Sequence, residues 1–153
     1  MRPYSQSLGF TFIGLLMVIA ISGIALAGVG ILWSHERQRE REQELLFAGD
    51  AYRKAIGSYY ESSPGNKVYP KTLEELLLDK RFPFKKRHLR KLYADPMRPS
   101  AAWSLVKLQG NIIGVHSTSQ ATPIKQAHFG LAYESFAEAK QYSDWKFVYT
   151  PGQ

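Results

Sequence analysis

Residues 10–33 read FTFIGLLMVIAISGIALAGVGILW and contain no ionisable side chain. About 20 apolar residues in a helix, at about 1.5 Å rise per residue, are enough to cross the hydrocarbon core of a bilayer. A helix can hold such a run in lipid because its backbone donors and acceptors pair within the segment. Gly23 and Ala27 place small residues four apart, so neighbouring helices could approach closely along that face. We therefore predict a transmembrane helix over residues 10–33.

A short polar leader, residues 1–9, precedes this segment and meets it at the Gly9–Phe10 junction. The combination resembles the class III signal sequence of type IV pilins and of type II secretion pseudopilins. The resemblance implies that prepilin peptidase cuts between Gly9 and Phe10 and methylates the new amino group of Phe10. It also implies a single-pass protein of the bacterial inner membrane with its carboxyl-terminal domain in the periplasm. Its other partners would then be membrane lipid, other pseudopilins and the inner-membrane assembly platform.

Two alternatives to pilin-type processing remain open for the amino-terminal segment. Ala25-Leu26-Ala27 matches the small-residue cleavage pattern of a secretory signal peptide, and a cut there would start the mature chain at Gly28. An uncleaved membrane anchor is the second alternative. Three arginines closely follow the apolar run and one precedes it, so charge counting alone does not place the leader in the cytoplasm.

The helix is expected to continue through residues 34–62 as an amphipathic segment. After a charged run, apolar residues recur at the spacing of one helical face. They are Leu45, Ala48, Tyr52, Ala55, Ile56 and Tyr59. Pro64, among turn-favouring residues, cannot continue a helix, so the helix should end near Glu61. Because the apolar stripe must be covered, we expect it to be the spine of a globular domain that includes residues 63–153.

The first element expected in this domain is a second, short helix. Thr72 and Glu75 have capping-box spacing, and leucines after Thr72 form one apolar side. These signals predict a helix from Leu73 to about Lys80.

Strands are expected to follow. Residues 103–109 and 112–116 alternate around a Gly110-Asn111 turn, which predicts a β-hairpin. Residues 145–149 predict a third strand, and residues 131–140 have a weak helical tendency. Helices followed by strands indicate an α+β fold with a small antiparallel sheet packed on the long helix. This order of elements resembles the domain of G-type pseudopilins.

Two departures from that family shape the functional prediction. The fifth residue after the predicted cut is Gly14, where family members usually carry a glutamate that neutralises a neighbour's amino terminus. An unpaired ammonium in lipid is costly, so we predict a minor or tip subunit, or one that needs a different partner. Major G-type subunits are expected to bind calcium through an acidic carboxyl-terminal loop. Here only Glu134, Glu138 and Asp144 follow Ser117, too dispersed for a predicted calcium site.

The most basic part of the chain is residues 80–91, where seven of twelve residues are lysine or arginine. The candidate anion-binding residues are Lys85, Lys86, Arg87, Arg90 and Lys91. Phosphate contacts need mobile positive charge, so the alternative function is a DNA-uptake or adhesive type IV pilin that uses this basic surface. A solvated face or an intersubunit salt-bridge surface is the favoured interpretation, with Phe82 and Phe84 expected to pack.

No pattern of catalytic or metal-ligating residues stands out in the sequence. The 153 residues carry a net charge of +7. They include no cysteine, and this absence excludes disulfides and thiolate metal sites. The four histidines lack zinc-site spacing, and no nucleophile elbow singles out a serine. We predict no catalytic residue, metal or cofactor. The predicted function is that of a structural pseudopilin subunit in a short periplasmic pseudopilus for protein export.

Overall fold

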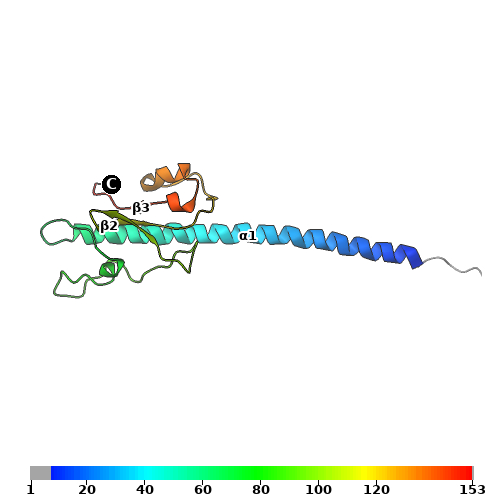
Figure 1. The fold of residues 1–153 in the computed structure, drawn as a ribbon, viewed down its shortest axis with the longest axis horizontal. Coiled ribbons are helices and arrows are strands. Elements are labelled where there is room, and N and C mark those ends of the chain that lie inside the picture. The colour runs from blue at the N-terminus through cyan, green and yellow to red at the C-terminus, as the bar shows by residue number, and fades with distance from the viewer. Residues whose placement is uncertain (1–7, 153) are drawn as a thin grey trace, which may run out of the picture. The chain divides into compact units, whose positions relative to one another are not determined.

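The computed structural model describes residues 8–152, except for the side chains of residues 8–11 and 24–32. Its elements in chain order, with η for 3-10 helices, are α1 (Leu8–Glu61), η1 (Leu73–Leu76), β1 (Ser104–Leu108), β2 (Asn111–His116), η2 (Leu131–Glu138), η3 (Tyr142–Asp144) and β3 (Phe147–Val148) (Figure 1). The chain divides into two compact units, one up to Gln38 and one from Arg39 onward. The predicted α+β class with a small antiparallel sheet is confirmed.

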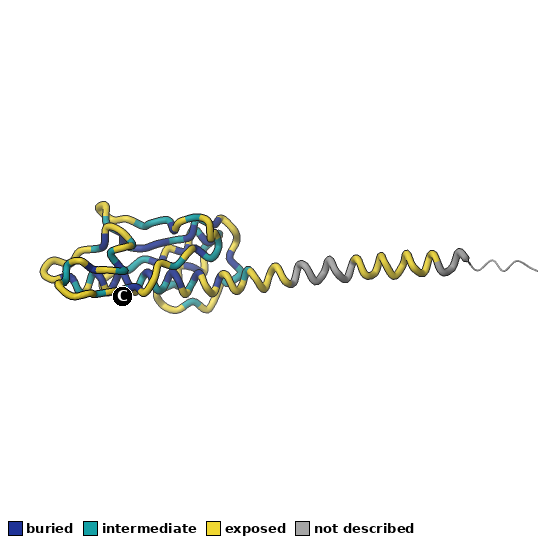
Figure 2. The backbone as a smooth tube through the Cα atoms, turned by 90° about the horizontal axis from the view of Figure 1, so that it is seen from below, coloured by how far each residue is buried: buried dark blue, intermediate teal, exposed yellow. Residues whose placement is uncertain are grey.

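The first unit contains the amino-terminal part of α1, whose described apolar side chains face solvent. Every residue from Phe12 to Gly23 is exposed (Figure 2). The large apolar ones among them are 51 to 66% exposed. Among the described residues, no helix combines the length and apolarity needed to cross a membrane. The predicted span includes side chains 24–32, and the predicted leader includes residues 1–7; both sets lie outside the described residues.

In the second unit, the remainder of α1 carries the predicted apolar stripe, and all six residues of the stripe are buried. The helix ends at Glu61, as Pro64 predicts. Gly65 follows with a φ of 86°, a left-handed conformation that glycine adopts at no steric cost. Figure 2 shows buried residues spread along this part of α1 and along the segments beside it. The stripe therefore forms the spine of this unit.

The second helix is shorter than predicted. η1 is a single 3-10 turn, Leu73–Leu76, and the prediction of a helix reaching Lys80 is wrong. The chain leaves the helical path because the backbone N–H of Asp79 donates to the carbonyl of Lys86, 2.9 Å away. An antiparallel bridge to Lys86 thus takes the donor that another helical turn would have used.

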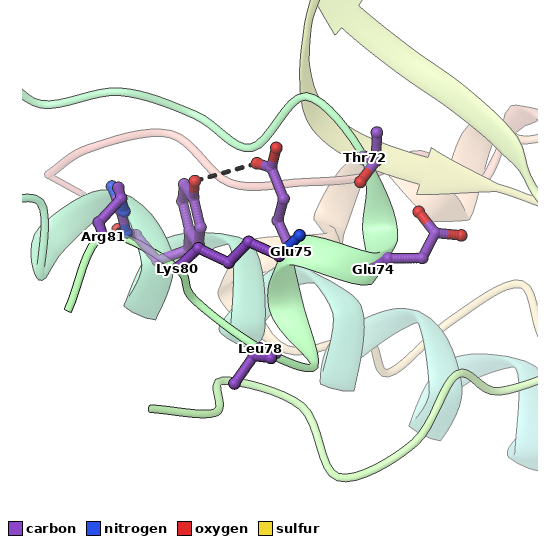
Figure 3. A pocket seen from close by; sticks show the side chains of 7 residues that line it. Thr72, Glu74, Glu75, Leu78, Lys80 and Arg81 are labelled. Atoms are coloured by element: carbon purple, nitrogen blue, oxygen red, sulfur yellow. Dashed lines mark hydrogen bonds between the residues drawn. The ribbon is translucent and has the colours of Figure 1, made fainter. Parts of the chain in front are cut away.

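The predicted capping box at the start of η1 is also wrong. Thr72 makes no side-chain capping hydrogen bond. Glu75 instead accepts a hydrogen bond from the backbone N–H of Lys71 at 3.0 Å. It also accepts one from the hydroxyl of Tyr59 at 3.0 Å (Figure 3). The carboxylate therefore ties η1 to the end of α1.

The sheet has the strand order β1-β2-β3 and is antiparallel throughout. The β1–β2 hairpin is confirmed, but its turn is Gln109-Gly110, with φ of 50° and 83°, and Asn111 already belongs to β2. Two successive positive φ values suit a tight two-residue hairpin, and they place the turn one residue earlier than predicted. A β-bulge lies between Val106 and Lys107.

The third strand is shorter than the predicted residues 145–149. β3 contains only Phe147 and Val148, because η3 immediately precedes it and the N–H of Trp145 donates to the carbonyl of Tyr142. The weak helical tendency of residues 131–140 appears as the 3-10 helix η2. The amino-terminal end of the predicted strand is thus used by other local structure, whereas the N–H of Tyr149 still donates to the carbonyl of Ile113 in β2 at 2.9 Å.

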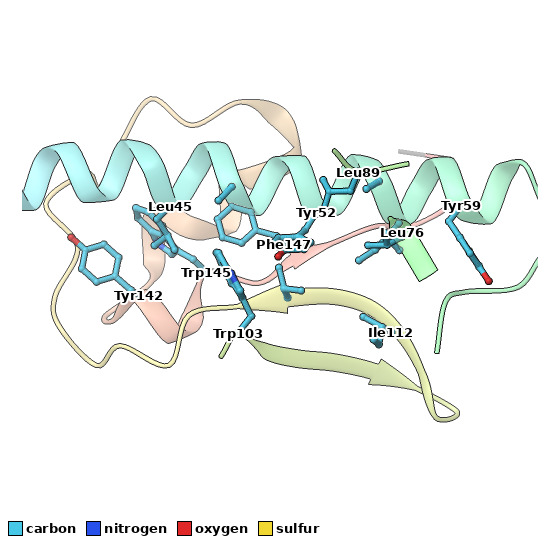
Figure 4. Packing of buried hydrophobic residues seen from close by; sticks show 14 of the residues in the cluster. Leu45, Tyr52, Tyr59, Leu76, Leu89, Trp103, Ile112, Tyr142, Trp145 and Phe147 are labelled. Atoms are coloured by element: carbon cyan, nitrogen blue, oxygen red, sulfur yellow. The ribbon is translucent and has the colours of Figure 1, made fainter. Parts of the chain in front are cut away.

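A hydrophobic core rich in aromatic residues joins α1 to these elements (Figure 4). Leu45 and Tyr52 of α1 share the core with Trp103, Trp145 and Phe147, and all five are at most 7% exposed. The hydroxyl of Tyr52 donates to the carbonyl of Tyr93 and accepts from its N–H, so the ring also ties down an irregular segment.

A buried carboxylate fastens the loop that follows β2. Glu42 of α1 is 3% exposed and accepts hydrogen bonds from the backbone N–H groups of Ile124 and Lys125. The hydroxyl of Tyr142 donates to the same carboxylate at 3.0 Å. Three donors satisfy this charge, as a buried carboxylate requires.

Candidate interaction surface

The predicted processing and assembly residues all lie along α1. Gly9 and Phe10 fall in its first turn, which begins at Leu8. A Cβ atom added at Gly14 or Gly23 would meet nothing within 4 Å. Ala27 is helical, and its side chain lies outside the described residues. The structure places these residues on one helix.

The predicted anion-binding residues lie in what we term the basic loop, residues 80–91. Lys85, Arg87, Arg90 and Lys91 are exposed, and Lys86 is half-buried. Phe82 pairs with Phe84 at a ring-centroid distance of 5.4 Å. Phe84 is nevertheless 62% exposed, so the expected packing of these two rings on each other leaves Phe84 largely open to solvent. The loop thus presents an aromatic ring together with its cations.

The loop is anchored by a buried carboxylate, that of Asp79, whose side chain is 1% exposed. Arg81 grips both of its oxygens: Nε donates to Oδ1 at 2.8 Å and Nη2 donates to Oδ2 at 2.6 Å. This two-point geometry is the strong form of an arginine–carboxylate pair. Arg81 is therefore the one cation of the basic loop that is internally neutralised among the described residues.

The same guanidinium connects the anchor to the end of α1. Arg81 Nη1 donates to the hydroxyl of Ser63 at 2.5 Å, and Nη2 donates to the carbonyl of Tyr59 at 2.8 Å. Its central carbon lies 3.5 Å from the centroid of the Tyr59 ring, a cation–π contact. One side chain thus satisfies the buried acid and two groups of the helix terminus.

His88 completes the anchor from the far end of the loop. Its Nε2 lies 3.1 Å from Asp79 Oδ2, and its Nδ1 lies 2.8 Å from Ser58 Oγ. Because an ionised carboxylate only accepts, Nε2–H must donate to Asp79, which leaves Nδ1 of the neutral ring to accept from Ser58. The arrangement fixes one tautomer of the imidazole.

Ser58, His88 and Asp79 are the residue types of a hydrolytic triad, but their setting suits an anchor better. The His88 side chain is 1% exposed, which closes it to a substrate. Ser58 sits within α1, where backbone N–H groups are used by the helix and are not free to form an oxyanion hole. Asp79 is also shared with Arg81.

The charges of the anchor follow from its hydrogen bonds. Although burial by itself raises the pKa of Asp79, hydrogen bonds from Arg81 and His88 hold that pKa well below its usual range. Burial lowers the pKa of His88, and the contact with Asp79 only partly opposes that effect. Burial and the hydrogen bond to Glu75 raise the pKa of Tyr59 to about 12, so its hydroxyl stays a donor. At neutral pH the anchor holds one anion, one cation and a neutral imidazole.

Backbone hydrogen bonds hold both ends of the loop against η1. The N–H groups of His88 and Leu89 donate to the carbonyl of Leu76 at 2.8 and 2.9 Å. With the bridge from Asp79 to Lys86, these bonds place the loop ends side by side. The exposed cations therefore belong to a loop whose backbone is fixed at its ends by hydrogen bonds.

A cavity of about 400 Å³ lies beside the anchor, lined by Tyr59, Thr72, Glu74, Glu75, Leu78, Lys80 and Arg81 (Figure 3). Glu75 and Arg81 already have protein partners. Glu74 and Lys80 are exposed. A ligand would therefore find opposite charges at the rim and an internally satisfied floor. Among the described residues, no group of three acidic or histidine side chains could hold a metal ion.

Sequence reasoning identified the cations of the loop and missed their anchor. Ser58, Asp79 and His88 are separated by up to thirty residues, and no local spacing links them. The available signal was a lone acid, Asp79, beside a dense run of bases. Comparisons with protein-family models, curated proteins and solved structures found no match.

Proposed function

We propose that this chain is a pseudopilin-type structural subunit, cut by prepilin peptidase between Gly9 and Phe10 and assembled through its apolar helix. In this proposal residues 10–33 hold the protein in the inner membrane as a single pass, and the second unit lies in the periplasm. Assembly with other pseudopilins on an inner-membrane platform would form a short filament for protein export.

The observation that carries the proposal is the exposed apolar face of α1. Described residues of the first unit, from Phe12 to Ile21, present eight large apolar side chains to solvent. Contiguous exposed apolar surface of this extent requires a lipid or protein cover. The same 54-residue helix then enters the core of the second unit. A helix that is apolar and exposed in the first unit and amphipathic in the second suits a subunit that packs laterally with its neighbours.

The site of amino-terminal cleavage tests the proposal. The full chain is expressed in a host that contains a prepilin peptidase and is recovered from membranes, and its intact mass and amino-terminal sequence are measured. We expect a chain that begins with N-methylated Phe10. The Gly9→Val variant should stay uncut, while the control Ser7→Val in the same leader should be cut normally. A wild-type chain beginning at Gly28 or at Met1 would refute pilin-type processing.

A further inference from the structure

The surface of the basic loop and its flanks contains two kinds of exposed side chain, cationic and apolar. Residues 78–92 include no serine, threonine, asparagine or glutamine, and the side chains of Asp79 and His88 are buried in the anchor. Leu78, Phe84 and Leu92 are 41, 62 and 39% exposed. The loop therefore offers charge and apolar contact, with almost no neutral hydrogen-bonding side chain.

The cations of the loop lack internal neutralisation. Among the described residues, no carboxylate pairs with six of them, which are Lys80, Lys85, Lys86, Arg87, Arg90 and Lys91. Asp79, the one acid of residues 78–92, is already paired with Arg81 in the anchor. Like charges gathered on one short segment repel each other, so a polyanion would relieve an existing repulsion.

The exposed ring of Phe84 rests on a second aromatic ring of the loop. Phe84 packs on Phe82, and the ammonium of Lys86 lies 4.1 Å from the centroid of the Phe82 ring. The anchor and the hydrogen bonds to Leu76 hold the loop ends. Binding would therefore order few additional groups, which lowers its entropic cost.

We propose that the basic loop binds the surface of an anionic phospholipid membrane. Lysine and arginine near such a surface each contribute about fivefold in affinity, and exposed phenylalanine and leucine enter the boundary between headgroups and acyl chains. Nucleic-acid binding would use the cations, which contact phosphates and guanine edges, but it leaves the exposed Leu78 and Leu92 without a role. This inference does not depend on pilin-type assembly.

A single label on the loop measures this binding. The chain has no cysteine, so Pro83→Cys gives one attachment point for an environment-sensitive dye on an exposed loop residue. The labelled full chain, in dodecylmaltoside micelles at about 0.1 M salt, is titrated with dihexanoyl phosphatidylglycerol and with dihexanoyl phosphatidylcholine. These short-chain lipids reach any surface of the protein. We expect saturable binding of the anionic lipid and at least about tenfold weaker binding of the zwitterionic one.

Two variants in the labelled background locate the site. Lys85→Gln/Arg87→Gln/Arg90→Gln should weaken binding about 100-fold, because three cations at about fivefold each are lost. The control Lys107→Gln/Lys140→Gln/Lys146→Gln removes the same charge from exposed positions elsewhere and should change affinity less than about threefold. Phe84→Ser keeps the net charge and should weaken binding about tenfold through lost apolar contact.

Three results would overturn the proposal. The two triple variants could lose affinity equally, which would mean that net charge acts without a site. The two lipids could bind equally well. A 20-base-pair DNA duplex could bind more tightly than the anionic lipid while Phe84→Ser has no effect, which would mark a nucleic-acid surface. Near-UV circular dichroism checks the fold, and Phe84→Ser alone still decides if the loop triple variant unfolds.

Discussion

Asp79 is the only acid between Glu75 and Asp95, and the fold buries it. A buried carboxylate is costly unless it is paired and hydrogen-bonded, and Arg81 and His88 provide both. The result at the residue scale is a separation of roles. Arg81 neutralises the buried Asp79, while most of the neighbouring cations are exposed to solvent.

The neutral imidazole of His88 predicts a pH-dependent stability. Burial lowers its pKa in the folded chain, so below about pH 6.5, the ordinary histidine pKa, the unfolded chain binds a proton that the folded chain does not. The free energy of unfolding should therefore fall as pH falls from 7 to 5. His88→Gln, which can still donate to Asp79, should flatten this part of the curve. Denaturant unfolding of the full chain in micelles, followed by near-UV circular dichroism, measures it.

The exposed His35→Gln serves as the control and should leave the slope unchanged. An unchanged slope in His88→Gln would assign the pH dependence to other groups.

Asp79→Asn leaves Arg81 without its charge partner and should lower the free energy of unfolding by about 3 kcal/mol, measured by the same denaturant unfolding.

At the scale of elements, α1 closely approaches β3 and the residue that follows it at two glycines of the helix. A Cβ atom at Gly49 would lie 2.3 Å from the Phe147 ring, and one at Gly57 would lie 2.6 Å from the Tyr149 ring. The two glycines are eight residues apart and so share a face of the helix. Phe147 is fully buried, whereas Tyr149 is half-buried and its hydroxyl donates to Glu61 at 2.7 Å in an exposed hydrogen bond.

This difference predicts opposite tolerance to the same substitution. Gly49→Ala should lower the free energy of unfolding by about 2 kcal/mol, because overpacking against a buried ring outweighs the gain in helix propensity. Gly57→Ala should lower it by only about 1 kcal/mol, because the half-buried Tyr149 ring can turn toward solvent at the cost of its exposed hydrogen bond to Glu61. Denaturant unfolding in micelles measures both variants. Equal losses would show that Tyr149 is held as firmly as Phe147.

At the scale of the whole molecule, the chain couples a helix with an exposed apolar face to a unit with an aromatic core. If the proposed assembly is correct, Gly14 removes the carboxylate that would orient a neighbouring subunit. A Cβ atom at this position meets nothing within 4 Å, so a larger side chain fits on the isolated helix.

Gly14→Glu should therefore increase self-assembly. We expect at least several-fold more high-molecular-weight product after chemical cross-linking of membranes that contain the assembly platform, because a charge pair replaces an unpaired ammonium in lipid. Gly14→Gln, of matched size and no charge, is the control. An equal increase in both variants would attribute the effect to packing and argue against the charge-pair model.

The sequence by itself determined the features that rest on local periodicity. The spacing of Leu45 through Tyr59 predicted a buried helical face, and Pro64 predicted the helix end near Glu61. Alternation around Gly110 predicted the hairpin to within one residue. These signals succeed because the interactions involved lie within a few residues of each other.

Only the tertiary structure decided the length of η1, the shortness of β3 and the anchor of the basic loop. Asp79 pairs with Lys86 instead of continuing a helix, and His88 meets Ser58 of α1 across thirty residues. The positions of Gly49 and Gly57 against β3 likewise depend on how helix and strand pack. Local propensities differ by only about 1 kcal/mol per residue, so buried charge pairs and close packing between distant segments override them.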